Sequence, residues 1–185
     1  MENTAVRLWK RIGREERLAA ATNFLREPSA ELVGSALAAI VRARHLRPQV
    51  ARTMSADEQA RALASVLDPG EPLAASLLVA LHIGDRRPML ATFLDAAGIP
   101  HEDGLLKDDA PPEPLGEDAA RAGVKALLAA YPAEQVQTYL NTLWLQDPQR
   151  WAALEQSGQA SRDSSPTTAG RLSRPSASRG GRSSQ

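Results

Sequence analysis

The sequence predicts an all-α protein built from antiparallel helical hairpins. Apolar residues make up 43% of the chain and are mostly alanine and leucine, which are strong helix formers. Only seven of the 185 residues are phenylalanine, tryptophan or tyrosine, and β-branched residues are scarce as well, although strands favour both kinds. Over most of the first 155 positions, apolar residues recur at spacings of three and four, the period of an amphipathic helix.

The N-terminal elements follow from this period and from its breaks. Residues 4–26 are predicted to be helical, with a kink or a split at Gly13, because glycine costs about 1 kcal/mol relative to alanine inside a helix. Pro28 ends this segment, since the residue before a proline disfavours the α conformation. A second helix is predicted over residues 29–45, with Ser29 as its N-cap.

Boundary signals divide the middle of the chain. Pro48 begins a short helix, because proline is tolerated at the first helical position. Ser55 and Glu58 have the spacing of a capping box, in which each side chain accepts a hydrogen bond from the other residue's amide. Pro88 lies in the first turn of a later helix, and Gly98 follows its end as a C-terminal cap. The helix after the capping box ends at residues 68–70, where the sequence is Asp-Pro-Gly, and another helix begins at Glu71 and Pro72, so four helices are predicted between Pro48 and Gly98.

Residues 99–116 interrupt the helical pattern. They contain four prolines, and from Glu102 to Asp118 there are seven acidic residues against one base, Lys107. We therefore predict a long acidic, proline-rich loop. Loops of this length without secondary structure are usually functional or disordered. Two further helices are expected afterwards, over residues 117–131 and 132–146, with a short final turn that carries Trp151.

The chain is predicted to have one helical domain, residues 1–155, and a disordered tail, residues 156–185. Apolar residues almost vanish from the tail, which is rich in serine, arginine and glycine. Such a segment cannot bury enough apolar surface to offset the conformational entropy lost on ordering. The tail carries five arginines and one acidic residue, Asp163, within a chain of net charge zero.

Three stretches of the helical domain look alike, which raises the question of an internal repeat. In each, an apolar helix is followed by a short break, a proline and a second apolar helix; the prolines are Pro48, Pro88 and Pro132. Spacings of 40 and 44 residues fall in the range of two-helix HEAT-type units. The fold is therefore either a short HEAT-like α-solenoid of about three units or an irregular helical bundle.

Polar residues cluster at both ends of the helix that begins near Pro88. They suggest a small-molecule or metal-dependent function at a pocket near His82, Asp85, Arg87 and His101. Residues 101–103 add acidic groups but lack any standard metal-ligand spacing, so no metal site and no cofactor are predicted. The candidate ligand-binding residues are His82, Asp85, Arg87, His101, Glu102 and Asp103.

Catalytic motifs are absent from the sequence. It has no cysteine, which excludes disulfides, thiolate zinc sites and cysteine nucleophiles. It also has no Gly-x-Ser-x-Gly nucleophile elbow and no glycine-rich phosphate loop in the helical part. We therefore expect binding rather than an enzymatic activity.

The leading functional hypothesis is a protein-binding or scaffold module of helical hairpins, with a protein of unknown identity as its partner. Trp144 and Trp151 lie seven residues apart near the end of the helical part and are candidate protein-binding residues. The alternative is that both close the core. Weak nucleic-acid association through the arginines of the tail is a second alternative, disfavoured because the tail has no aromatic residue to stack on bases. No apolar run is long enough to span a bilayer, and a cytoplasmic location is expected.

Overall fold

The computed structural model describes residues 4–26, 30–106 and 114–154. Within these ranges the chain is mainly helical, with a single two-stranded sheet, so the predicted all-α class is confirmed. The predicted N-cap Ser29, residues 107–113 of the predicted acidic loop and the predicted disordered tail, residues 156–185, lie outside the described residues.

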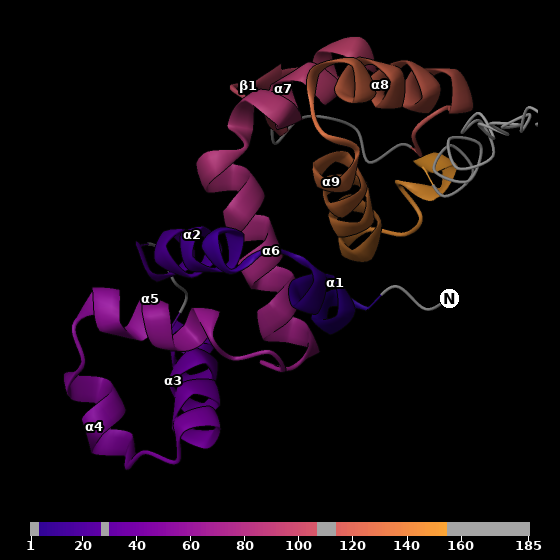
Figure 1. The fold of residues 1–185 in the computed structure, drawn as a ribbon. Helices are drawn as coiled ribbons and strands as arrows, with labels where there is room; N and C mark the ends of the chain where they lie inside the picture. The colour runs from indigo at the N-terminus through magenta and orange to yellow at the C-terminus, as the bar shows by residue number, and fades with distance from the viewer. Residues whose placement is uncertain (1–3, 27–29, 107–113, 155–185) are drawn as a thin grey trace, which may run out of the picture.

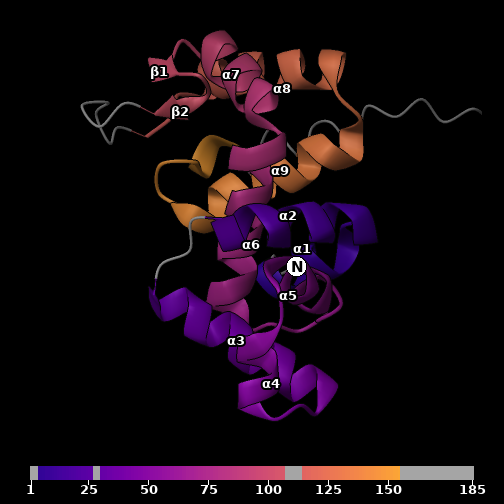
Figure 2. The ribbon, with the colours of Figure 1, turned by 90° about the vertical axis from the view of Figure 1, so that its left-hand side faces the viewer.

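The N-terminal half is a group of helices packed around α6 (Figure 1). Helix α2 packs against α5 and α6, and α1 packs against α6 as well. Helices α3 and α4 contact each other and lie at one end of the molecule (Figure 2). The bounds are α1 Ala5–Arg11, α2 Arg14–Arg26, α3 Ala30–Arg44, α4 Pro48–Thr53, α5 Ala56–Ala64 and α6 Glu71–Asp85.

Three predicted helix boundaries in this half are confirmed. The expected break at Gly13 separates α1 from α2, and Pro48 is the first residue of α4. At α5, the amide of Glu58 donates to the Ser55 hydroxyl at 3.3 Å, and the amide of Ser55 donates to the Glu58 carboxylate at 2.8 Å. The hydrogen bond from the Ser55 amide, aided by that from its hydroxyl, lowers the pKa of Glu58.

The C-terminal half contains α7 (Arg87–Ala96), the strands β1 (His101–Glu102) and β2 (Leu105–Leu106), α8 (Glu117–Ala130) and α9 (Ala133–Gln146). Pro88 lies in the first turn of α7, as predicted. After α7 the backbone turns at Gly98, whose φ of +69° is the left-handed conformation of a C-terminal glycine cap. The amide of Ile99 then donates to the Leu94 carbonyl at 2.9 Å.

The prediction that residues 99–116 form a loop is wrong for its first part, which is an antiparallel β-hairpin. Asp103 and Gly104 form its two-residue turn, with φ of +48° and +79°. Positive φ at both positions is typical of a type I′ turn, which matches the twist of a hairpin. A Cβ on Gly104 would lie 2.8 Å from the Arg87 carbonyl oxygen, so this glycine also allows the hairpin to pack closely against α7.

The buried side chains form two hydrophobic clusters, which we call the first and second cores. The first core is built by α1–α6 and includes Trp9, Leu63 and Leu77, none of which is exposed. The second core is built by α7, α8, α9 and the terminal turn, and includes Phe93 and Trp151. Helix α6 runs from the first group of helices to the second, where α9 packs against it (Figure 1).

The three prolines of the possible repeat each stand at or beside the start of a helix. Pro48 begins α4, Pro88 lies in the first turn of α7, and Pro132 is the N-cap of α9. The helices that they open differ in length, with 6, 10 and 14 residues. A HEAT-like repeat therefore stays a prediction, whereas the pairing of helices on either side of each proline is seen in α3 with α4, α6 with α7 and α8 with α9.

Two glycines provide a matched test of how closely α8 approaches α7. A Cβ on Gly123 would lie 2.6 Å from the ring of Phe93, whereas a Cβ on Gly34 of α3 would meet nothing within 4 Å. We expect Gly123→Ala to lower the free energy of unfolding by about 1–2 kcal/mol, because overpacking outweighs the gain in helix propensity. Gly34→Ala is expected to raise it by about 0.5–1 kcal/mol. Urea denaturation of both variants measures the difference, and equal effects would contradict the close packing.

Candidate functional site

A cavity of about 170 Å³ lies where the second core meets α6. Helices α6, α7 and α9, the β-hairpin and the terminal turn all contribute to its wall. The thirteen lining residues, all within the described ranges, include no charged side chain. They are Val79, His82, Ile83, Leu90, Leu94, Gly104, Leu105, Leu106, Tyr139, Thr142, Leu143, Gln146 and Trp151.

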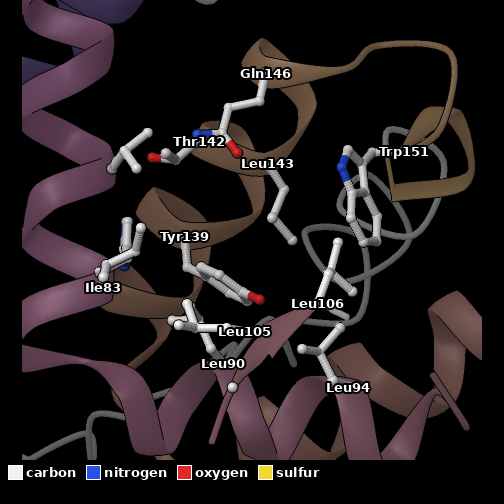
Figure 3. A pocket seen from close by; sticks show the side chains of 13 residues that line it. Ile83, Leu90, Leu94, Leu105, Leu106, Tyr139, Thr142, Leu143, Gln146 and Trp151 are labelled. Atoms are coloured by element: carbon white, nitrogen blue, oxygen red, sulfur yellow. The ribbon is translucent and has the colours of Figure 1, made fainter. Parts of the chain in front are cut away.

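Most of the wall is carbon. Figure 3 shows Leu143 of α9 pointing into the middle of the cavity, with Leu90 and Leu94 of α7 along one side. Ile83 on α6 and Leu106 on β2 flank the cavity and are 37% and 36% exposed, which is unusual for large apolar side chains in this protein. Gln146 on α9 is the third exposed residue of the wall, so the cavity opens beside α6, the hairpin and the end of α9.

His82 is the most unusual polar residue of the wall. It is 3% exposed, and neither ring nitrogen has a hydrogen-bond partner among the described residues. Burial lowers the pKa of His82 to about 3, and the positive charge of Arg86 adds to this effect. The imidazole is therefore neutral at pH 7, and its donor and acceptor nitrogens are buried among protein atoms without a hydrogen-bond partner in the described chain.

The sequence explains why this histidine is buried. Leu73, Leu77, Leu78 and Leu81 form the buried face of α6, and His82 continues that face one turn after Leu78. At its C-terminal end α6 is held to α2, because Arg86 pairs with Glu16 and the Asn23 amide donates to Asp85 at 2.9 Å. These contacts fix the last turn of α6, and with it the position of His82.

Four aromatic rings form a row, and three of them, those of His82, Tyr139 and Trp151, line the cavity. The ring centroids of His82 and Tyr139 are 5.2 Å apart, those of Tyr139 and Phe93 5.7 Å, and those of Phe93 and Trp151 6.0 Å. The tilted and edge-on angles of these pairs are those that aromatic rings prefer. Burial raises the pKa of Tyr139, so its hydroxyl stays protonated at neutral pH.

The other five candidate ligand-binding residues do not line the cavity. Asp85 is exposed and bonded to Asn23, as described above, and Glu102 is exposed on β1. Arg87 and Asp103 do come together, in an exposed ion pair of 3.1 Å, a kind of contact that contributes little to stability. Of the six predicted residues, only His82 reaches the cavity.

His101 supports the hairpin. Its Nε2 lies 3.0 Å from a carboxylate oxygen of Asp95, and its Nδ1 accepts a hydrogen bond from the Gly104 amide at 3.1 Å. This arrangement requires the proton on Nε2 and ties the turn of the hairpin to the end of α7. Across residues 4–26, 30–106 and 114–154, no three histidine, aspartate or glutamate residues lie close enough to hold a metal ion together.

The two tryptophans predicted to bind a protein have different environments. Trp151 is 3% exposed and belongs to the second core, whereas Trp144 on α9 is half-buried. They therefore do not form an exposed pair. A protein-binding role stays a prediction, and it would have to rest on Trp144.

Sequence reasoning missed most of the cavity wall, including Gly104, Leu105, Thr142 and Tyr139. No protein-family model, curated protein or solved structure matches the chain. In the described part of the chain, none of the helices is long and apolar enough to cross a membrane. The functional argument therefore depends on the cavity and the residues around it.

Proposed function

We propose that this protein is a non-catalytic binding domain that holds a small, largely apolar molecule in the cavity between α6, α7 and α9. The observation that carries the proposal is the cavity itself, with carbon-rich walls and an opening beside Ile83, Leu106 and Gln146. Ligand sites in proteins are typically concave, mostly apolar and placed between helices, with a few polar groups that orient the ligand.

The volume limits the size of the ligand. Sites for drug-sized molecules measure about 300–1,000 Å³, and an apolar cavity of about 150 Å³ binds benzene. The cavity of about 170 Å³ is therefore suited to a molecule with a single ring or a short branched chain.

The position of the cavity gives binding a structural consequence. Val79, His82 and Ile83 come from α6, which anchors the first core, while Leu94 and Leu143 belong with the second core. A molecule in the cavity would contact both sides at once. Binding would therefore stabilise the arrangement of the two cores by mass action, because the unfolded chain has no such site.

Benzene titration followed by NMR tests the proposal. The chain has three tryptophans, and two of them report on different places: Trp151 lines the cavity, while the Trp9 indole donates to the Val66 carbonyl at 2.7 Å inside the first core. We expect benzene to shift the indole N–H signal of Trp151 in a saturable manner and to leave that of Trp9 in place. Equal shifts of both signals, or none, would overturn the proposal.

A matched pair of variants locates the binding. Leu143→Trp fills the cavity and is expected to weaken benzene binding at least about tenfold, because its side chain occupies the space of the ligand. Leu128→Trp makes the same change on α8 at a residue that is 42% exposed and outside the cavity, so affinity should be unchanged. If Leu143→Trp does not fold, Ile83→Trp blocks the mouth instead. Unchanged affinity in a folded blocking variant would show that benzene binds elsewhere.

A further inference from the structure

The hydroxyl of Tyr139 is a buried polar group that opens onto the cavity. Tyr139 on α9 is 2% exposed and belongs to the wall. In Figure 3 its hydroxyl points into the cavity, toward Leu106. Within the described chain this hydroxyl forms no hydrogen bond, and it is not enclosed by protein atoms. Because a buried donor without a partner is unfavourable, a ligand that pairs with this hydroxyl gains affinity.

The other polar side chains of the wall are less suited to hold a ligand. The nitrogens of His82 are enclosed by protein atoms, so a molecule in the cavity cannot reach them. The Thr142 hydroxyl already donates to the carbonyl one turn earlier on α9, at 2.8 Å. Gln146 is exposed at the opening, where water competes for its amide. In Figure 3 the indole nitrogen of Trp151 lies at the end of its ring that is farther from the Tyr139 hydroxyl.

We infer that the cavity selects an uncharged, largely apolar molecule with one hydrogen-bond acceptor, and that this acceptor binds the hydroxyl of Tyr139. The inference rests on the proposed function and adds the chemical class of the ligand. A tyrosine hydroxyl can donate and accept, but its oxygen lone pair is partly delocalised into the ring, so it pairs best as a donor. A carbonyl oxygen, an ether oxygen or the nitrogen of an aromatic ring would accept from it.

The same wall disfavours charged ligands. A carboxylate or an ammonium group would lose its hydration on entering the cavity, and none of the thirteen lining residues carries an opposite charge to compensate. A hydrogen bond from the neutral Tyr139 hydroxyl replaces only part of that hydration. The acceptor is therefore expected on an uncharged group, with the rest of the ligand against the leucines.

The test compares pyridine with benzene in the wild-type protein and in Tyr139→Phe at pH 7. The two rings have nearly the same shape and both are uncharged at this pH, but pyridine has a nitrogen that accepts a hydrogen bond. Phenylalanine removes the hydroxyl and keeps the ring that packs between His82 and Phe93. The ratio of pyridine affinity to benzene affinity is expected to be about three- to tenfold higher in the wild type than in Tyr139→Phe, as for one hydrogen bond.

A matched variant and two further probes complete the test. Gln146→Leu removes the amide at the opening and should leave the pyridine-to-benzene ratio unchanged. Pyrrole, whose N–H donates but whose ring does not accept, should respond less than pyridine to the loss of the hydroxyl. Benzoate should bind the wild type at least about tenfold more weakly than benzaldehyde, an uncharged acceptor of similar size.

The outcomes separate the inference from the proposed function. If neither benzene nor pyridine binds the wild type, the proposed function fails and the inference with it. If both bind but the ratio is the same in Tyr139→Phe, or falls only in Gln146→Leu, the inference fails and the binding domain stands. A response of pyrrole as large as that of pyridine would contradict selection for an acceptor, and benzoate that binds as tightly as benzaldehyde would contradict selection for an uncharged ligand.

A measurement on the wild type alone guards against a variant that does not fold. The ¹³C chemical shift of a tyrosine Cζ reports hydrogen bonding at the hydroxyl, and the chain has two tyrosines. Tyr131 is the internal control, because it does not line the cavity and its hydroxyl lies 3.4 Å from that of Thr92. Pyridine is expected to move the Cζ resonance of Tyr139 and not that of Tyr131, and benzene at the same occupancy should move it much less. Identical responses of Tyr139 to the two ligands would overturn the inference.

Discussion

Lowering the pH from 7 to 4.5 is expected to reduce the free energy of unfolding by roughly 2–3 kcal/mol through His82 alone. Burial lowers the pKa of this histidine from 6.5 to about 3 in the folded protein. As the pH falls below 6.5, the unfolded chain binds a proton that the folded protein does not. The contribution of His82 to the free energy of unfolding is therefore fully present above pH 6.5. It is lost progressively down to about pH 3, with a slope of up to about 1.4 kcal/mol per pH unit.

The pH window isolates this histidine from the carboxylates. The pKa of Glu58 is lowered from 4.5, so the stability that depends on its ionised form is lost only at pH values below that. The groups that face His82 are Tyr139 of α9, which is neutral throughout this range, and Arg86, whose positive charge opposes protonation of the imidazole. Between pH 6.5 and 4.5, the part of the slope that disappears when His82 is replaced thus reports on the buried imidazole.

Two histidine variants provide the comparison for urea denaturation at several pH values. His82→Leu should lose most of the slope between pH 6.5 and 4.5 and be at least as stable as the wild type at pH 7, because a buried unpaired polar group is replaced by an apolar one. His45→Asn leaves His82 intact and should keep the slope; asparagine tolerates the positive φ of +52° at this position. A slope that persists in His82→Leu would show that His82 is not buried as described.

Local signals in the sequence predicted the helices well because they act over a few residues. The break at Gly13, the capping box of Ser55 and Glu58 and the cap at Gly98 all depend on neighbouring backbone groups. The hairpin was also predictable, since Asp103-Gly104 is a strong signal of a type I′ turn. The surrounding acidic and proline-rich composition obscured that signal.

The cavity could not be predicted in the same way. Its walls come from α6, α7, the hairpin, α9 and the terminal turn, so it depends on how segments about 70 residues apart approach one another. Asp85, Arg87 and His101 were predicted to bind a ligand because they lie near one another in the sequence. In the structure their side chains bond to other surface or hairpin groups. His82 differs because the helical period continues the apolar face of α6 through it. The helical spacing of the leucines in α6 was therefore the signal in the sequence that His82 is buried.

Replacing Trp9 with alanine is expected to lower the free energy of unfolding by about 3–5 kcal/mol, the typical cost of removing a large aromatic side chain from a core. Trp9 is 0% exposed, and its indole N–H donates to the Val66 carbonyl at 2.7 Å, which joins α1 to the segment after α5. Domains of this size are usually stable by only about 5–15 kcal/mol, so the loss would be a large part of the total.

Two further variants separate packing from hydrogen bonding in the same urea experiment. Trp9→Phe keeps most of the ring but leaves the Val66 carbonyl without its donor, and we expect an intermediate loss of about 1–3 kcal/mol. Trp144→Ala removes a half-buried tryptophan from α9 and should cost less than either change at Trp9. Because α6 belongs to the first core and also packs against α7 and α9, loss of Trp9 should destabilise both cores in one cooperative transition. Two separate transitions would show instead that the second core folds without the first.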